Sequence, residues 1–252
     1  MVRTVIAGNW KMHKTAHEAM ELIDGLRALS AEFPDGVDVL VAPPFTALQA
    51  VSQRLNGDER IKLCAQTMHW ENQGAYTGEI SPVMLKEFGC EYVILGHSER
   101  RQFCGETNQY IRLKTRAALA HGITPIIAVG ETLEEKDRGL TKDKVVTQTQ
   151  EALTGLAEEQ IRSVILAYEP IWAIGSGKND DPQNADATMA EIRACLPALR
   201  EVPILYGGSV KPENMAAYAA MPNINGALVG GASLQAQSFA GIITAAAPAV
   251  AR

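Results

Sequence analysis

The sequence lacks the features that mark secreted, membrane-bound and nucleic-acid-binding proteins. Its 252 residues include 4 cysteines, none in a Cys-x-x-Cys pair, so neither a zinc site nor a disulfide framework is indicated. No run approaches the roughly 20 apolar residues of a membrane-spanning helix, and the apolar start is too short for a signal peptide. Basic residues are not in excess, because 23 Lys and Arg stand against 29 Asp and Glu. These absences argue against nucleic-acid and membrane partners and favour a cytoplasmic protein with reduced thiols.

What the sequence does contain is a regular alternation of short apolar runs and longer amphipathic segments. Pro82 and Pro212 predict helix starts, and Gly89 and Gly122 predict helix ends in the left-handed conformation. Eight apolar runs rich in Val and Ile are typical of strands buried on both faces. These runs are Thr4–Ala7, Val37–Ala42, Ile61–Ala65, Tyr92–Leu95, Thr124–Val129, Val164–Tyr168, Pro203–Tyr206 and Gly226–Val229.

Eight strand–helix repeats in a chain of this length predict an α/β protein with one closed (β/α)8 barrel, a single domain over residues 1–252. The competing fold, an open doubly wound sheet, usually has G-x-G-x-x-G after its first strand, where this chain has Gly8–Lys11. The charged stretch Glu134–Arg138 is interpreted as solvated surface. After the sixth strand, the apolar spacing predicts one amphipathic helix that carries Met189, Ile192, Leu196 and Leu199.

Polar and glycine residues follow most of the predicted strands, at the end of a barrel where active sites lie. Together a Lys, a His and a Glu can bind an anion, donate a proton and accept one. Glycines after the seventh and eighth strands suit a phosphate site. The tract Gly175–Lys178 is similar to a P-loop but fails its pattern at Trp172 and Asn179. The strand-end residues are Asn9, Lys11, 96–101, Gly130, Glu131, 169–178, 207–209, Gly230 and Gly231.

Six motifs, in order along the whole chain, resemble the triosephosphate isomerase family. They are Gly8–Met12 (GNWKM), Gly74–Glu79 (GAYTGE), Gly96–Arg101 (GHSERR), Ala167–Lys178 (AYEPIWAIGSGK), Tyr206–Val210 (YGGSV) and Gly230–Leu234 (GGASL). A single Gly-Gly-Ser would be a weak signal, whereas this ordered set is specific. The resemblance implies the TIM barrel fold.

The resemblance also implies an aldose–ketose isomerase of glycolysis and gluconeogenesis. The family interconverts dihydroxyacetone phosphate and D-glyceraldehyde 3-phosphate through an enediolate, without a metal or an organic cofactor. Glu169 would take the carbon-bound proton, and His97 would polarise the carbonyl and move protons between the two oxygens. Asn9 and Lys11 would contact the substrate. Ser98 and Glu99 would support this polar cluster.

The resemblance further implies a phosphate site, a lid and a homodimer. Backbone N–H groups of Gly175, Ser209, Gly230 and Gly231 would hold the phosphate. The loop that carries Tyr76, Thr77 and Gly78 would reach a pocket beside Lys11 and His97 of a second subunit, in an isologous dimer. The lid would consist of Pro170, Ile171, Trp172, Ala173, Ile174, Gly175, Ser176, Gly177 and Lys178.

Two expectations about pKa accompany these roles. A free Glu, with a pKa of about 4.3, is a weak base for a C–H proton, so burial under Trp172 and Ile174 is expected to raise the pKa of Glu169. His97 directly precedes an expected helix start. The positive end of that helix dipole is expected to disfavour the imidazolium and keep the ring neutral.

Two other functions compete with the isomerase. A sugar-phosphate epimerase on a similar barrel would be expected to place metal-ligating His and Asp at several strand ends, where only His97 occurs. A barrel kept for binding or scaffolding would be expected to have lost Lys11, His97 or Glu169. The chain departs from the family's common residues at Cys104, Asn108, Ala128, Ser176 and Asn179–Ala185, none of which is an expected catalytic group.

Overall fold

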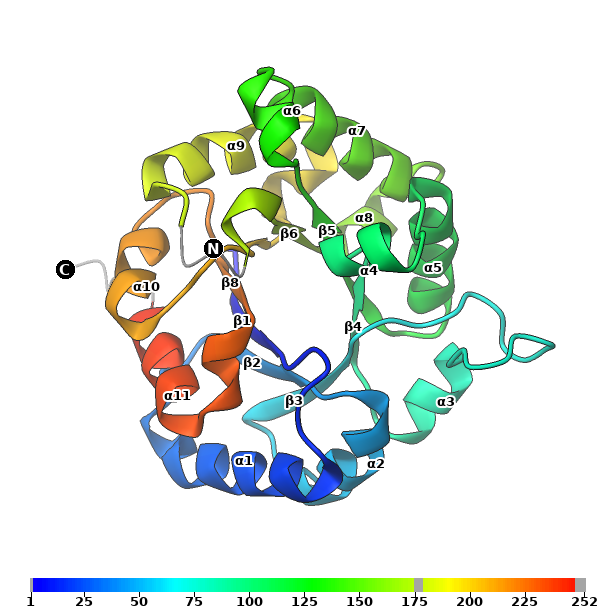
Figure 1. Ribbon diagram of the computed structural model, residues 1–252, viewed down its shortest axis with the longest axis vertical. Helices are drawn as coiled ribbons and strands as arrows, with labels where there is room; N and C mark the ends of the chain where they lie inside the picture. Colours follow the sequence, from blue (N-terminus) through cyan, green and yellow to red (C-terminus); the bar gives the residue numbers. More distant parts are fainter. Residues whose placement is uncertain (1, 175–178, 248–252) are drawn as a thin grey trace.

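A ring of parallel strands forms the centre of the computed structural model, which describes residues 2–174 and 179–247 (Figure 1). Within these residues each strand pairs in parallel with the next, and β8 pairs with β1, so eight strands close a barrel in chain order. The predicted (β/α)8 fold is confirmed. The strands are β1 (Thr4–Asn9), β2 (Val37–Ala42), β3 (Ile61–Ala65), β4 (Tyr92–Leu95), β5 (Thr124–Val129), β6 (Ile165–Tyr168), β7 (Ile204–Tyr206) and β8 (Gly226–Val229).

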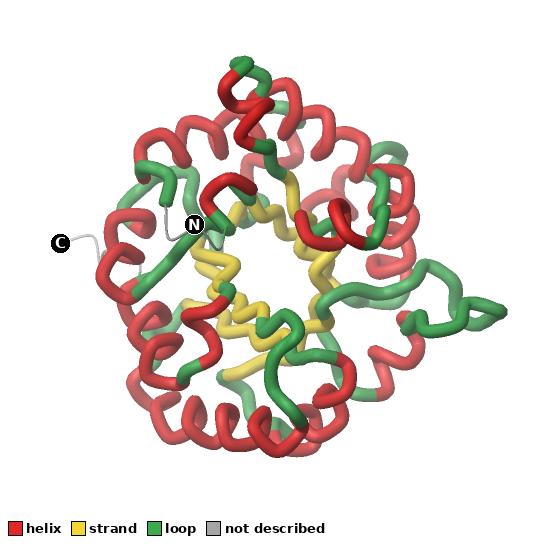
Figure 2. Tube along the Cα trace, viewed as in Figure 1, coloured by secondary structure: helices red, strands yellow, loops and turns green. Residues whose placement is uncertain are grey.

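Helices surround this ring on all sides (Figure 2). The α-helices are α1 (Ala16–Leu29), α2 (Phe45–Arg54), α3 (Pro82–Glu87), α4 (Ser98–Phe103), α5 (Asn108–Ala120), α6 (Leu133–Asp137), α7 (Thr141–Leu153), α8 (Glu158–Arg162), α9 (Pro182–Ala194), α10 (Pro212–Ala219) and α11 (Ala236–Ala245). Short 3-10 turns are η1 (Ser30–Glu32), η2 (Ile171–Ala173), η3 (Pro197–Glu201) and η4 (Gly231–Leu234). The predicted signals hold: Pro82 and Pro212 open α3 and α10, and Gly89 and Gly122 take φ values of 73° and 64°.

The apolar residues form two cores, one inside the barrel and one between barrel and helices. Along β1, Val5 and Ala7 belong to the inner core and Ile6 belongs to the outer one. The same alternation occurs in β2, where Leu40 faces inward and Val41 outward. This period of two is what strands buried on both faces require.

The strand predictions hold to within two residues, and the differences have local causes. β1 continues to Asn9 because Gly8 and Asn9 still pair with β2. β7 begins after Pro203, which lacks an N–H but accepts a hydrogen bond from Leu166 N at 3.0 Å.

The single helix predicted after β6 is wrong. α9 ends at Ala194, and Leu196 is extended, with φ −144° and ψ 134°, because a residue before proline disfavours the helical conformation. The chain then re-forms a 3-10 turn that buries Leu199 completely. The apolar spacing was therefore correct about which residues face the core but not about the continuity of the helix.

The loop after β3 extends away from the barrel before it enters α3 (Figure 1). Polar residues in the other strand-end loops converge on the barrel mouth. Among the described residues, none of the helices combines the length and apolarity that crossing a membrane would need.

Gly226 is a point on which barrel closure depends. Its φ is +123°, and a Cβ there would overlap the carbonyl oxygen of Val5, its partner across the β8–β1 seam. Gly226→Ala should lower the free energy of unfolding by about 2–6 kcal/mol, from backbone strain and steric overlap of about 1–3 kcal/mol each. Urea unfolding measures this change.

The matched control is Gly57→Ala. Gly57 also has a positive φ, +78°, but nothing lies within 4 Å of the added Cβ. Strain alone should cost it no more than about 2 kcal/mol. If Gly226→Ala and Gly57→Ala lowered the free energy of unfolding equally, a special role for the β8–β1 seam would be contradicted.

Candidate active site

A cavity of about 250 Å³ opens at the carboxyl ends of the strands. Its volume is below the roughly 300–1,000 Å³ of drug-sized pockets, so it suits a small ligand. It brings together the predicted residues Asn9, Lys11, His97, Glu169, Ser209, Gly230 and Gly231. Ile174, Gly207, Gly208, Val210, Lys211, Leu228 and Ala232 complete the wall. The predicted site residues Gly175, Ser176, Gly177 and Lys178 lie outside the described residues.

His97 and Glu169 touch each other at the bottom of this site. His97 Nε2 lies 2.9 Å from Glu169 Oε1, and both residues are buried, at 5% and 2% exposure. The Ser98 N–H donates to Glu169 Oε2 at 2.8 Å. On the other side of the ring, His97 Nδ1 accepts a hydrogen bond from Glu99 N at 3.2 Å. The neutral ring therefore carries its proton on Nε2, which points at the carboxylate.

This contact reverses both expected pKa directions. Burial raises the pKa of Glu169, but the His97 ring and the Ser98 N–H outweigh burial and hold it below its usual range. Burial lowers the pKa of His97, but the carboxylates of Glu169 and Glu99 outweigh burial and raise it. The predicted helix start after His97 is present as α4, yet its dipole does not decide the direction. Sequence reasoning missed that the two groups are each other's partners.

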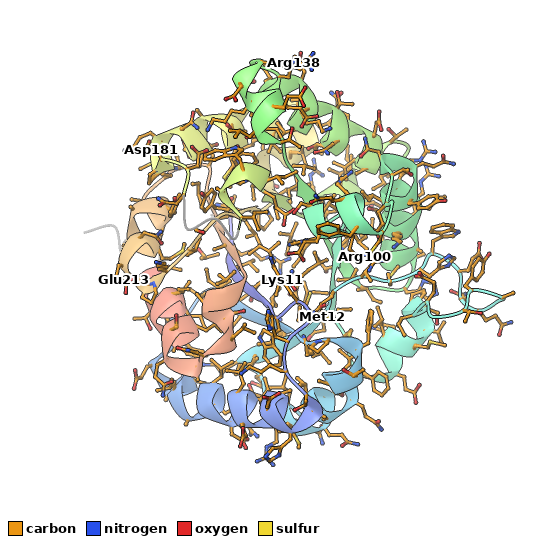
Figure 3. The ribbon with its side chains drawn as sticks, in the orientation of Figure 1. Lys11, Met12, Arg100, Arg138, Asp181 and Glu213 are labelled. Carbon is orange, nitrogen blue, oxygen red and sulfur yellow. The ribbon has the colours of Figure 1, made fainter. Side chains whose placement is uncertain are left out.

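Lys11 is held in an uncommon backbone conformation with its ammonium inside the site. Its φ is +52°, a left-handed value that costs a non-glycine residue about 1–3 kcal/mol. The Lys11 N–H donates to Asn9 Oδ1 at 3.0 Å, and Lys11 Nζ donates to Glu99 Oε1 at 2.6 Å. Figure 3 shows Lys11 near the middle of the barrel mouth. A cation is thus positioned beside the His97–Glu169 pair.

Gln66 supports this arrangement and was not singled out from the sequence. Its side-chain amide donates to the carbonyl oxygens of Lys11 and Ala42, both at 2.8 Å. The strained segment after β1 is thereby tied to the end of β2. Its position directly after β3 is the signal that could have identified it, because polar residues at the ends of the other strands line the site.

The glycine-rich wall of the cavity comes from the loops after β7 and β8. A Cβ at Gly230 would lie 3.9 Å from Lys11 Nζ, so the ammonium and this loop face the same space. Gly208 packs so tightly on the Tyr206 ring that a Cβ would overlap it. Lys211, which sequence reasoning missed, is also part of this wall. The glycine backbone and the Lys11 ammonium therefore face the same end of the cavity.

The predicted lid is described up to Ile174, which lines the cavity together with Glu169. Trp172, the other expected cover of Glu169, is not among the described residues that line the cavity. Its indole N–H donates to Glu131 Oε1 at 2.8 Å, and Lys136 Nζ lies 3.4 Å from the centroid of its ring. Because burial outweighs its neutral donors, the pKa of Glu131 is raised. The interpretation of the charged stretch 134–138 as solvated surface is therefore incomplete at Lys136.

Tyr76, Thr77 and Gly78 lie in the loop that projects from the barrel and are exposed in this chain. The Tyr76 ring packs against the His69 ring in a tilted arrangement, with centroids 4.1 Å apart, which braces the loop. Within one chain these residues do not line the cavity.

A buried ion cluster beneath α4 was also missed. Glu106 Oε1 accepts hydrogen bonds from Arg100 Nε at 2.5 Å and from Lys114 Nζ at 2.6 Å, and Lys114 also donates to Thr67. Burial raises the pKa of Glu106, but the two cations outweigh burial and lower it. This cluster joins the start of the projecting loop to α4 and α5. No cluster of three His, Cys, Asp or Glu side chains fit to hold a metal occurs in the described part of the chain.

Comparisons with known proteins agree on one family. The family model described as Triosephosphate isomerase matches residues 4–246. The chain is 50% identical to the triosephosphate isomerase of Caldanaerobacter subterraneus subsp. tengcongensis, over 96% of this chain and 99% of that protein. It is 51% identical to the triosephosphate isomerase of Herpetosiphon aurantiacus, over 96% of this chain and 99% of that protein. For Symbiobacterium thermophilum the identity is 50%, over 98% of each chain.

The ion cluster predicts a pH-dependent stability. Because the pKa of Glu106 is lower in the folded protein than in the unfolded chain, its contribution is present above about pH 4.5 and is lost as pH falls through the folded value. Glu106→Gln leaves buried Lys114 without its carboxylate and should cost about 3–5 kcal/mol at pH 7. Urea unfolding should show that the difference in free energy of unfolding between Glu106→Gln and the unchanged protein becomes smaller below about pH 4.

Glu134→Gln is the matched control. Glu134 pairs with Arg138 at 3.6 Å, but its side chain is 81% exposed. Such a surface pair contributes about 0–1 kcal/mol, so the control should be nearly neutral at both pH values. If Glu106→Gln lowered the free energy of unfolding by the same amount at every pH, the ionic role of the cluster would be refuted.

Proposed function

The chain belongs to the triosephosphate isomerase family, and from that premise we propose how its residues carry the reaction. The chain is an isomerase that interconverts dihydroxyacetone phosphate and D-glyceraldehyde 3-phosphate, a glycolytic activity. We propose that Glu169 is the base, His97 the acid, and Lys11 with Asn9 the substrate contacts. The observation that supports this assignment is that all four line one small cavity whose other wall is rich in glycine.

The 2.9 Å contact between His97 and Glu169 has a direct chemical consequence. Both groups must touch the substrate, the base at carbon and the acid at oxygen, so the contact must open when substrate enters. Glu169 then loses two hydrogen-bond donors while it stays buried, and burial alone raises its pKa. The carboxylate thereby becomes a stronger base at the moment at which it faces the C–H bond.

His97 and Lys11 supply the electrophilic side. The proton on His97 Nε2 can hydrogen-bond to a carbonyl oxygen and stabilise the oxyanion that forms as Glu169 removes the proton from carbon. The enediolate has two adjacent oxygens, and the same ring can return a proton to either. The ammonium of Lys11 compensates the negative charge. Glu169 then returns its proton to the neighbouring carbon, which completes the isomerisation.

We propose that the phosphate lies at the opposite end of the cavity. Backbone N–H groups of Ser209, Gly230 and Gly231, with that of Gly175, would hold it, and glycines permit the close approach that this requires. We also propose that Ser98 and Glu99 keep their supporting roles and that Pro170–Lys178 is the lid. Exclusion of water by a lid would protect the enediolate from side reactions.

We further propose a homodimer that works in the cytoplasm without a cofactor, each chain being a single domain. Exposed apolar side chains flank the site at Met12 and Phe103, which are 94% and 74% exposed. Others lie on the projecting loop and α3, at Tyr76, Val83 and Met84. An isologous dimer would bury the loop of each chain against the site of the other. The four cysteines are free, which suits a reducing compartment.

The decisive test of the reaction is a coupled assay on both triose phosphates with a chelator present, for the unchanged protein and for Glu169→Gln. Loss of the base should lower kcat about 10²–10⁴-fold, while the Kd for the analogue glycerol 3-phosphate changes little. Glu201→Gln, an exposed glutamate far from the cavity, is the control and should match the unchanged protein.

Three results would contradict the assignment. Absence of isomerisation would reject the function, and activity that requires metal would favour the epimerase. Equal losses of kcat and analogue binding in Glu169→Gln would make Glu169 a structural residue.

For the dimer, sedimentation at micromolar concentration should give about twice the chain mass of 27.2 kDa. Tyr76→Asp places a charge on the loop tip and should shift the mass toward that of one chain. Leu133→Asp is the control, since Leu133 is 55% exposed but lies on α6, away from α3 (Figure 1). A monomer for the unchanged protein would overturn the dimer.

A further inference from the structure

Arg101 makes contacts that set it apart from its neighbours on α4. Its guanidinium donates to three acceptors: Gly96 O at 2.8 Å, Ala128 O at 3.0 Å and Asn108 Oδ1 at 2.6 Å. Gly96 has a φ of +73° and packs directly against this side chain, so the carbonyl is presented to it. Arg100, one position earlier, instead binds Glu106.

The first two acceptors extend the barrel where its ladder ends. β4 pairs with β5 as far as Leu95 and Ile127, and Gly96 and Ala128 are the next residues on each strand. The guanidinium therefore bridges the two strands one step beyond their last pair. β5 in turn pairs with β6, and Glu169 N donates to Val129 O at 2.8 Å. A continuous path links the loop of His97 to the backbone of Glu169 through Arg101.

The charge of Arg101 is not paired. In the part of the chain that the structure describes, no carboxylate lies within 4 Å of its guanidinium. Its acceptors are two backbone carbonyls and the neutral amide of Asn108. The carboxylates that act on it from further away are Glu169 first, then Glu106 and Glu151. Burial outweighs their attraction and lowers the pKa of Arg101, which stays a cation.

We propose that Arg101 is a positioning residue for the isomerisation, which bridges Gly96 and Ala128 to fix His97 relative to Glu169 and directs an unpaired positive charge toward the Glu169 carboxylate. The proposal rests on the function proposed above. It assigns two separable roles to one side chain. The hydrogen bonds set the geometry of the acid and the base, and the charge favours the ionised, proton-accepting form of the base.

Other charged groups face the same carboxylate. His97 contacts Glu169 directly, and Lys11 shares the cavity with it. Glu99 lies on the far side of the His97 ring, 3.6 Å from Nδ1. Arg101 is the cation of this set that lies on α4, and it is not among the described residues that line the cavity. Substrate therefore does not displace it.

Two substitutions separate the roles of Arg101. Asn108→Asp keeps the hydrogen bond but pairs the guanidinium with a carboxylate. Arg101→Lys keeps the positive charge but removes the guanidinium, whose separate N–H groups donate to the carbonyls of Gly96 and Ala128. The readout is the pH dependence of kcat/KM at low ionic strength, whose acid limb reports the coupled His97–Glu169 pair together with the substrate phosphate. The phosphate contributes equally in every variant.

Asn108→Asp should move the acid limb to higher pH by about 0.3–0.5 unit, because the added charge is well screened, with kcat on the plateau within about twofold. Gln109→Glu, which adds a carboxylate at the next, exposed position of α5, should leave the limb in place. Arg101→Lys should leave the limb in place but lower kcat about 10–100-fold, as expected for a misplaced catalytic group.

The outcomes are decisive. No shift in Asn108→Asp, or equal shifts in Asn108→Asp and Gln109→Glu, would overturn the electrostatic role. Full kcat in a folded Arg101→Lys would overturn the geometric role. If Glu169→Gln retains activity, the proposed function itself fails. If Glu169→Gln is inactive while neither Asn108→Asp nor Arg101→Lys behaves as expected, the proposed function stands and only the role of Arg101 is rejected.

Discussion

The active site depends on the closure of a parallel barrel. Because all strands run in one direction and β8 pairs with β1, every carboxyl end reaches the same rim. Residues as distant in the chain as Asn9 and Gly231 thereby line one cavity of about 250 Å³. Closure also restricts the sequence where neighbouring backbones come closest. At Gly130 a Cβ would overlap the carbonyl oxygen of Glu169, so the residue that packs on the Glu169 backbone has no room for a side chain.

The rim buries three glutamates, and their neighbours give them different properties. Glu106 is surrounded by the cations of Arg100 and Lys114, which lower its pKa against the effect of burial. Glu131 has neutral donors, from Tyr168 and Trp172, so burial prevails and its pKa is raised. Of these three, Glu169 is the one that borders the cavity, and its partner is the His97 ring. Of the three, Glu169 is therefore the one whose proton affinity a ligand can change.

Much of the architecture could be predicted from the sequence, because apolar runs and glycine or proline signals are local. The strand ends, and with them Lys11, His97 and Glu169, followed from that pattern and from the family resemblance. The side-chain partners did not. The pKa directions of His97 and Glu169 depend on a contact between residues 72 positions apart, a separation that no periodicity records. Gln66 and Lys136 were missed for the same reason, since each acts on a residue from another strand–helix unit. Glu106 was missed although its cationic partners Arg100 and Lys114 are only 6 and 8 positions away, because no helical or strand spacing marks a buried ion pair across a loop.

The groups around the cavity differ in how firmly they are held, and this difference determines which one can move. Lys11 is fixed by Gln66 and Asn9 through its backbone, and the loop of His97 is bridged to β5 by Arg101. The backbone of Glu169 is fixed by Val129. The Glu169 carboxylate, in contrast, is held among the described residues by the His97 ring and the backbone N–H of Ser98, which substrate can replace. Under the proposed mechanism, rigidly held donors surround a carboxylate whose own partners the substrate replaces, so that the arrival of substrate increases the basicity of Glu169.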